Sequence, residues 1–307
     1  MRYFLCLSYD GAEFCGWQIQ PHSPSVQACL EAALSRLLSR PVQVTGAGRT
    51  DTGVHASGYV AHFDIDGFLP YEASNFTYKL NAILPRSIAV HSVSPVADDL
   101  HSRFSAKRRE YTYFIHREKD PFVRQYSWLC GYPGLDFAAM NEACQYLLGT
   151  HDFSCFEKTG GDNKTSICTV HQAFWAPYTP SFRSVMGAPP VRRSFVATAP
   201  QDDKTFPAGA PDGPSDVTDA LSGGGLCLYG RTSCHSERSE ESPYWYFRIA
   251  ADRFLRNMVR ATVGSLIEVG RGKHRPQWIA ELIASGTRSD AGESVPGHAL
   301  FLSSVNY

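Results

Sequence analysis

Short runs in which apolar and polar positions alternate are separated, in the first third of the chain, by two segments with helical spacing. Alternation places Leu5 and Leu7 on one face of a strand, and apolar residues at every third or fourth position after Ser25 predict a helix that Ser25 caps. The predicted order is strand 2–10, helix 25–40, strand 41–45, strand 58–65, helix 72–84 and strand 88–96. Residues 46–57 lack such a pattern and are expected to form a loop.

The second part of the chain repeats this order of elements with different residues. It predicts strand 110–117, helix 137–149, strand 165–175, strand 244–254, helix 255–270 and strand 299–307, with an extra helix over 275–286. The order β-α-β-β-α-β is that of the ferredoxin-like unit, in which helices cover one face of an antiparallel sheet. We therefore expect an α+β fold of two ferredoxin-like halves with antiparallel sheets.

Two such halves predict two domains, residues 1–104 and 105–307, in a chain of 307 residues with 43% hydrophobic content. A cleft between them is expected where loop 46–57 of the first half faces the arginine-bearing helix 255–270 of the second. Clefts between domains are preferred ligand sites, so this cleft is the expected active site.

Residues 179–242 depart from both periodicities. They are rich in Pro, Gly, Ser and acidic residues, which predicts a disordered insertion between the two middle strands of the second half. A structureless loop of this length normally argues against the strands on either side. Because the composition changes abruptly at both ends, we keep these strands as a hairpin. A hidden folded module in the insertion is the alternative.

Charge is divided unevenly along the chain, although the formal net charge is only −1. Residues 200–243 hold eight acidic and three basic side chains. Residues 101–130 hold seven Lys or Arg against three acids, and residues 245–275 hold seven against two. Basic clusters are most often solvated surface, but two in one chain also fit a polyanionic partner such as nucleic acid.

Composition and cysteine usage argue against a membrane, secreted or metal-binding protein. No apolar stretch reaches the roughly 18 residues of a membrane span, and the start has no cleavable leader pattern. The nine cysteines form no C-x-x-C pair, and the eleven histidines are scattered. We expect a soluble cytoplasmic protein with no metal site and no disulfide framework.

The expected loop contains the segment GAGRTDTGVHA, residues 46–56, in which Asp51 lies among glycines. A dinucleotide-binding turn is one interpretation, but Asp51 stands where the third glycine belongs, its charge would repel a pyrophosphate, and no helix follows. A second is a tight turn in which Asp51 bonds its own backbone. A third is a catalytic loop, in which glycines admit a bulky substrate and the carboxylate acts as nucleophile or general base.

This segment and four others resemble, in order and spacing, the tRNA pseudouridine synthase A family. The others are YDGAEFCGWQIQP, RFSAKRREYTYFI, FLRNMVRATVGSLIEVG and LFLSSVNY, so the resemblance covers essentially the whole chain outside the insertion. It implies the pseudouridine synthase fold and isomerisation of uridine to pseudouridine in the tRNA anticodon stem-loop, at positions 38, 39 and 40, without metal or cofactor. It also implies a homodimer. The insertion departs from the family's short hairpin, which leaves open whether the usual tRNAs are substrates.

The resemblance assigns catalytic roles to three residues. Asp51 matches the essential aspartate and is the expected nucleophile; attack at C1′ of the ribose, attack at C6 of the uracil and promotion of a glycal intermediate all stay open. Tyr111 matches the tyrosine that stacks on the target base and can act in its proton transfers, although by sequence alone it also fits an ordinary strand aromatic. Arg260 matches the basic partner of the aspartate, on a helix face that is otherwise apolar and where an arginine needs a partner.

Other basic residues are expected to contact RNA. Arg49 matches a family arginine that enters the space left when the uridine is flipped out of its stack. Six more are candidates for phosphate contacts that fix the register of the RNA: Arg103, Lys107, Arg108, Arg109, Arg253 and Arg256. Side chains read A-form RNA poorly, so shape and backbone should select the stem-loop. The competing function is an RNA-binding module without catalysis, against which the combination of Asp51, Tyr111 and Arg260 argues.

Overall fold

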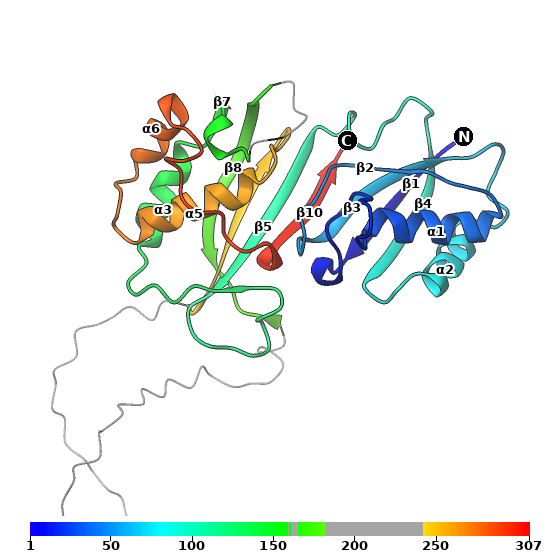
Figure 1. Ribbon diagram of the computed structural model, residues 1–307, viewed down its shortest axis with the longest axis horizontal. Coiled ribbons are helices and arrows are strands. Elements are labelled where there is room, and N and C mark those ends of the chain that lie inside the picture. The colour runs from blue at the N-terminus through cyan, green and yellow to red at the C-terminus, as the bar shows by residue number, and fades with distance from the viewer. Residues whose placement is uncertain (159, 161–164, 182–241) are drawn as a thin grey trace, which may run out of the picture. The chain divides into compact units, whose positions relative to one another are not determined.

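The computed structural model describes residues 1–158, 160, 165–181 and 242–307 (Figure 1). The predicted insertion, 179–242, therefore lies outside the described residues except at its ends. The strands on either side pair as the hairpin that the sequence predicts, with β8 (Ile167–Pro177) antiparallel to β9 (Tyr244–Ala251).

The first half contains the elements that the periodicity predicts, with their ends moved by a few residues. They are β1 (Arg2–Tyr9), α1 (Val26–Leu38), β2 (Val44–Gly46), β3 (His55–Asp64), α2 (Ala73–Ile83) and β4 (Ile88–Val96). The Ser25 side chain accepts a hydrogen bond from the Ala28 amide, which confirms the predicted cap of α1. Strand β3 begins earlier than predicted because its first residues pair with a strand from the other end of the chain.

The second half also follows the predicted order. Besides β8 and β9 it contains β5 (Arg108–His116), α3 (Phe137–Gln145), α5 (Met258–Gly270), α6 (Trp278–Ser285) and β10 (Leu300–Asn306). The sequence pattern misses two short strands, β6 (Trp128–Leu129) and β7 (Gly149–Asp152). The prediction that a helix reaches residue 149 is wrong: α3 ends at Gln145, and Gly149 has a φ of 100°, a left-handed geometry from which β7 starts. Single 3-10 turns lie at Gly11–Glu13, Ser154–Phe156 and Gly297–Ala299.

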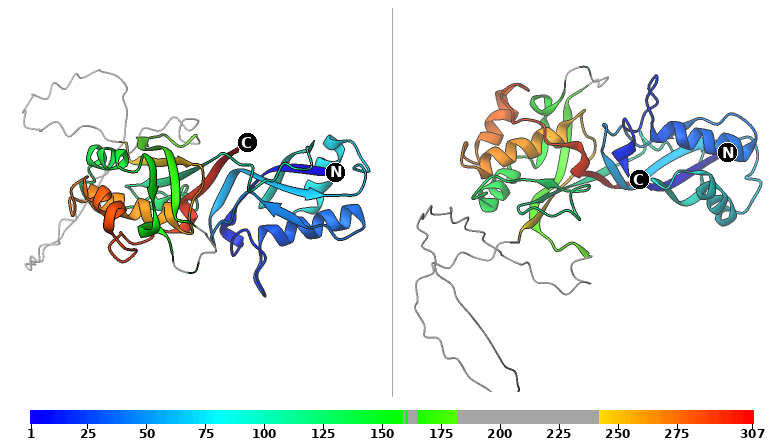
Figure 2. Two further views of the ribbon diagram at one scale, coloured as in Figure 1. Left: turned by 90° about the horizontal axis from the view of Figure 1, so that it is seen from above. Right: turned by 60° about the horizontal axis from the view of Figure 1, so that its bottom comes forward.

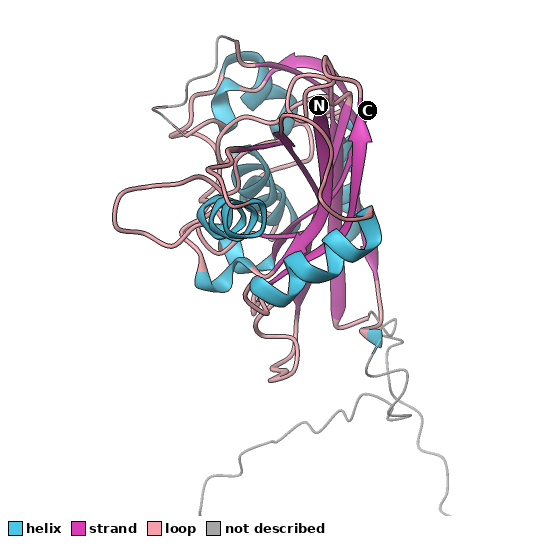
Figure 3. Ribbon diagram, turned by 90° about the vertical axis from the view of Figure 1, so that its right-hand side faces the viewer, coloured by secondary structure: helices cyan, strands magenta, loops and turns pink. Residues whose placement is uncertain are grey.

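Ten strands form one sheet in the order β4-β1-β3-β10-β5-β9-β8-β7, with β2 paired to β3 and β6 to β5. Figure 3 shows the strands gathered in one layer with helices packed beside it. When the four main strands of each half are counted in chain order, both halves have the spatial order fourth, first, third, second. The predicted α+β fold of two ferredoxin-like halves is confirmed. The domain boundary at residues 104 and 105 stays a prediction.

The two halves join where β10 lies parallel to β3. Phe301 pairs with His55, and β2 pairs further along the same edge of β3. Both views of Figure 2 show β10, in red, between the two halves. Gly58 permits this close approach, since a Cβ atom there would lie 2.2 Å from the Ser303 carbonyl oxygen. The sheets of the two halves are therefore continuous.

One hydrophobic cluster of buried residues runs through both halves. It contains Leu30 and Leu34 of α1 as well as Val263 and Leu266 of α5. Because the core is shared, the segments at the ends of β2, β3 and α5 rest on a common framework. Within the described ranges, none of the helices has both the length and the apolar character needed to cross a membrane.

Candidate active site

The segment that carries Asp51 connects β2 to β3 and is held against the first half by backbone contacts. Gly46 must be glycine, since a Cβ atom there would lie 2.1 Å from the Tyr59 hydroxyl oxygen. That hydroxyl donates to the Gly48 carbonyl oxygen, and the Ala47 amide donates to the Val60 carbonyl at 2.9 Å. The start of the loop is therefore fixed on β3. We call residues 47–54 the catalytic loop, after the role proposed for Asp51.

Thr50 fixes the middle of the catalytic loop. It is buried, its hydroxyl lies 2.9 Å from the Tyr9 hydroxyl, and its carbonyl accepts from the Trp17 amide at 3.2 Å. The Gly53 amide donates to the Phe14 carbonyl at 3.4 Å. These partners come from β1 and from the segment that follows it, so the loop is held on both sides of Asp51.

The Asp51 side chain takes no part in building this turn. The Val54 amide closes the turn by donating to the Asp51 carbonyl oxygen at 3.1 Å. In the part of the chain that the structure describes, no hydrogen bond to the loop backbone involves the Asp51 carboxylate, which is 36% exposed. The turn interpretation, in which the aspartate bonds its own backbone, is therefore wrong for this loop.

Arg260, in the first turn of α5, faces the Asp51 carboxylate. Arg260 Nη1 lies 3.6 Å from Asp51 Oδ2, and the Arg260 side chain is 23% exposed. Arg260 Nε donates to the Val295 carbonyl at 2.6 Å, and the Val295 amide donates to the Arg260 carbonyl at 3.3 Å. The guanidinium is thus oriented by the segment that precedes β10, and it presents a fixed positive charge to the carboxylate.

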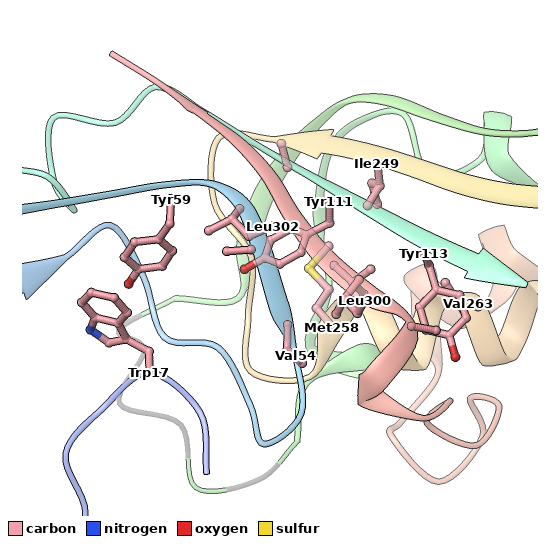
Figure 4. Packing of buried hydrophobic residues seen from close by; sticks show 14 of the residues in the cluster. Trp17, Val54, Tyr59, Tyr111, Tyr113, Ile249, Met258, Val263, Leu300 and Leu302 are labelled. Carbon is pink, nitrogen blue, oxygen red and sulfur yellow. The ribbon is translucent and has the colours of Figure 1, made fainter. Parts of the chain in front are cut away.

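Tyr111 lies on β5, opposite Leu302 of β10 and Ile249 of β9. Figure 4 shows its ring beside Leu302, with the hydroxyl directed toward the side on which Tyr59 and Trp17 lie. Burial raises the pKa of Tyr111 to about 12, with a smaller rise from Asp51 and a lowering by Arg109. Tyr111 is therefore a neutral phenol at neutral pH. Its hydroxyl has no hydrogen-bond partner among the described residues.

The predicted RNA-contacting residues differ in their exposure and in what their side chains contact. Arg49, Arg103, Lys107 and Arg256 are exposed. Arg108 is half-buried and donates to Gln172 Oε1 at 3.0 Å, and Arg253 is also half-buried. Arg256 Nη1 donates to the Gly160 carbonyl at 3.4 Å. Arg109 is also half-buried, but its guanidinium donates to the backbone carbonyl oxygens of several segments. The structure thus brings Asp51 and Arg260 together and places Tyr111 near enough to Asp51 for the carboxylate to affect its pKa. The Arg109 guanidinium is turned toward backbone carbonyl oxygens.

Sequence reasoning missed His55, the first residue of β3, which directly follows the catalytic loop. Its Nδ1 accepts from the Gly11 amide at 2.9 Å, so Nε2 carries the proton and donates to the His298 carbonyl at 2.9 Å. Burial lowers the pKa of His55, which keeps the ring neutral even though Asp10 Oδ1 lies 3.0 Å from Nδ1. His55 is therefore structural, and its place in the GVHA segment is the sequence signal that could have found it.

The described residues contain no group of three or more His, Cys, Asp or Glu side chains placed to hold a metal ion. The seven cysteines in these ranges are free thiols, four of them buried. Asp51, Arg260 and Tyr111 supply this site with one carboxylate, one guanidinium and one phenol.

Comparison with known proteins gives a consistent result. The family model described as tRNA pseudouridine synthase matches residues 5–105 and 143–307. The chain is 39% identical over 306 residues to tRNA pseudouridine synthase A of Bacteroides fragilis, covering 100% of this chain and 96% of that protein. It is 40% identical to the protein of the same name from Bacteroides thetaiotaomicron, covering 100% and 90%. A third, from Parabacteroides distasonis, is 38% identical over 310 residues and is covered to 96%. The chain therefore belongs to the tRNA pseudouridine synthase family.

Proposed function

We propose that this protein isomerises uridine to pseudouridine in the anticodon stem-loop of tRNA, at positions 38, 39 and 40, with Asp51 as the catalytic nucleophile. The family to which the chain belongs supports the reaction class, an isomerisation. The observation that carries the residue assignment is that the Asp51 carboxylate is partly exposed, faces Arg260 at 3.6 Å and has no role in its own turn.

The chemistry needs an ionised carboxylate. The N1–C1′ bond of uridine breaks, C5 forms a new bond to C1′, the proton on C5 leaves, and N1 takes up a proton, so that no atom is gained or lost. A carboxylate can attack C1′ or C6, or stabilise positive charge on the ribose while a glycal forms. The Arg260 guanidinium, 3.6 Å from Asp51 Oδ2, places a positive charge beside that carboxylate.

Tyr111 is proposed to stack on the target base and to take part in its proton transfers. Its ring is held edge-on by Phe254, with centroids 5.0 Å apart and an interplanar angle of 83°. The unpartnered hydroxyl is available to the base. Since its pKa is about 12, Tyr111 enters the reaction protonated and serves first as a hydrogen-bond donor.

Access to the base requires that uridine leave its stack. We propose that Arg49, exposed two residues before Asp51, fills the space that the uridine leaves. Arg103, Lys107, Arg108, Arg253 and Arg256 are proposed as phosphate contacts that set the register of the stem-loop. The protein is further proposed to be a cytoplasmic homodimer with domains at 1–104 and 105–307.

The test is release of tritium from C5-labelled uridine in tRNA transcripts that carry a single uridine at position 38, 39 or 40. Wild-type protein should release tritium from each transcript, and a transcript without these uridines should release none. Binding without release from any transcript would show that the protein is an RNA-binding module instead.

A further inference from the structure

The Arg109 guanidinium donates five hydrogen bonds, all of them to backbone carbonyl oxygens. Nε and Nη2 donate to Ala47 O at 3.2 and 2.9 Å. Nη1 donates to Asp252 O at 2.8 Å and to Ala106 O at 3.5 Å, and Nη2 donates also to Arg103 O at 2.5 Å. A guanidinium has five N–H groups. Every donor of Arg109 is therefore engaged, and none remains for a phosphate.

The acceptors belong to three segments that meet at the site. Ala47 opens the catalytic loop, four residues before Asp51. Asp252 follows β9 and begins the connection to α5, whose first turn carries Arg260. Arg103 and Ala106 lie in the connection between the two halves. Arg109 thus bonds both the loop that carries Asp51 and the connection that leads into α5, the helix that carries Arg260.

Two of these acceptor residues, Ala47 and Asp252, are themselves held by hydrogen bonds to strands. The Ala47 amide donates to Val60 of β3 at 2.9 Å. Asp252 is tied to β8, because its Oδ1 accepts from the Thr169 amide at 2.8 Å and its own amide donates to the Thr169 carbonyl at 3.1 Å. Arg109 therefore joins two fixed points, one in each half, and the distance between them cannot relax freely.

No carboxylate pairs with the Arg109 charge among the described residues. Burial lowers the pKa of Arg109, while nearby tyrosines, with Tyr111 the foremost, oppose that lowering. Carbonyl oxygens from three segments of the chain take the place of water around the Arg109 guanidinium. A lysine could not reproduce this arrangement, because its three N–H groups diverge from one nitrogen and cannot span the planar fork.

We infer that Arg109 is a positioning residue that fixes the catalytic loop against the β9–α5 connection, and so sets the distance between Asp51 and Arg260, rather than a phosphate contact. The inference rests on the proposed function of Asp51 and Arg260. It separates Arg109 from Arg108, its neighbour in sequence, which remains proposed for RNA contact.

The test compares Arg109→Lys with Arg108→Lys and with Arg40→Lys, the last a distant surface arginine that also donates to a backbone carbonyl, Asp66 O, at 3.2 Å. Arg109→Lys should lower the single-turnover rate on the order of 10- to 100-fold, with the tRNA Kd and its salt dependence unchanged. Arg108→Lys should act on Kd, and Arg40→Lys should change neither. A raised Kd with a normal rate for Arg109→Lys would overturn the inference.

A second measurement uses unmodified protein, in case Arg109→Lys does not fold. Phenylglyoxal labelling read by mass spectrometry should leave Arg109 unmodified with or without tRNA, while exposed Arg103 reacts and tRNA protects it. Reaction of Arg109 in the free protein and protection by tRNA would overturn the inference. If wild-type protein releases no tritium from any tRNA, the proposed function fails, and the labelling pattern still decides whether Arg109 is engaged as described.

Discussion

Arg260 Nη1 lies 3.6 Å from Asp51 Oδ2, and the two residues come from different halves of the chain. The separation is that of an ion pair rather than of a close hydrogen bond. Both side chains are partly exposed, so the Asp51 oxygens lie near a cation and stay accessible to a substrate.

Asp51→Asn should reduce tritium release from C5-labelled tRNA to background. The amide keeps the size of the side chain but cannot act as a nucleophile or stabilise a cation. Because the catalytic loop is held by Gly48, Thr50 and Gly53 rather than by this carboxylate, the unfolding temperature should stay within a few degrees of wild type. The tRNA affinity should persist or rise, since a negative charge is removed. Substantial turnover by this variant would refute Asp51 as the nucleophile.

Arg260→Lys should lower the single-turnover rate on the order of 100-fold and the unfolding free energy by about 1 kcal/mol. Lysine keeps the charge, but it loses the Nε bond to the Val295 carbonyl that orients the guanidinium. The matched control is Arg271→Lys at the other end of α5, where the guanidinium lies 3.9 Å from the Tyr132 ring centroid. Equal rates for the two variants would show that the orientation of Arg260 is unimportant.

Tyr111→Phe should lower the rate by on the order of 100-fold or more, because the phenol is lost while the ring is kept. Tyr3→Phe, another buried strand tyrosine, should not change it. If Tyr111→Phe kept the wild-type rate, the role of Tyr111 would be confined to stacking.

The same substitution predicts a change in the pH dependence of stability. The folded-state pKa of Tyr111 is about 12 against 10.0 for the free side chain. The resulting contribution of Tyr111 to the free energy of unfolding is therefore fully present below pH 10 and is lost as the pH rises through 12. This contribution is about 2–3 kcal/mol. Denaturant titrations between pH 9 and 12 should show a shallower loss of stability for Tyr111→Phe than for Tyr3→Phe. Parallel curves would contradict the assignment.

Replacing residues 182–241 by a short Asn-Gly turn should leave a folded, active protein. The ends are already paired: the Tyr178 amide donates to the Tyr244 carbonyl at 3.0 Å, and Ser242 Oγ donates to the Tyr178 carbonyl at 3.2 Å. Shortening a loop between paired ends changes closure entropy only slowly. Circular dichroism, thermal unfolding and tritium release would measure the result, and loss of folding or of tRNA selectivity would show that the replaced residues are required.

The sequence predicts an element well where the residues that determine its ends lie in or next to the element itself. Strand 88–96 matches β4 at both ends, and Ser25 caps α1 through its own side chain. It fails where the deciding contact is distant or the element is short. Strand β6 has two residues, too few to show an alternating pattern. Helix α3 ends at Gln145 although apolar residues continue past it toward Gly149, whose φ of 100° does not fit a helix.

The residues of the candidate site were likewise only partly predictable from the sequence. A glycine-flanked acid and its family resemblance are sufficient to single out Asp51, but the chain alone cannot tell which arginine in a basic run faces water. Arg108 and Arg109 are chemically identical neighbours, and alternation on β5 sends their side chains to opposite faces. What each then meets, Gln172 or the Ala47 carbonyl, is fixed by strands far away in sequence.

Because β10 lies between β3 and β5, the centre of the sheet is filled by a strand that follows both of its neighbours in the sequence. During synthesis, both neighbouring strands leave the ribosome long before β10 does, and the part of each edge that β10 covers stays unpaired until then. Such edges favour association with other chains. A nascent chain of this protein therefore stays exposed to aggregation until β10 has emerged and paired, and deletions within 300–306 should harm solubility more than their length suggests.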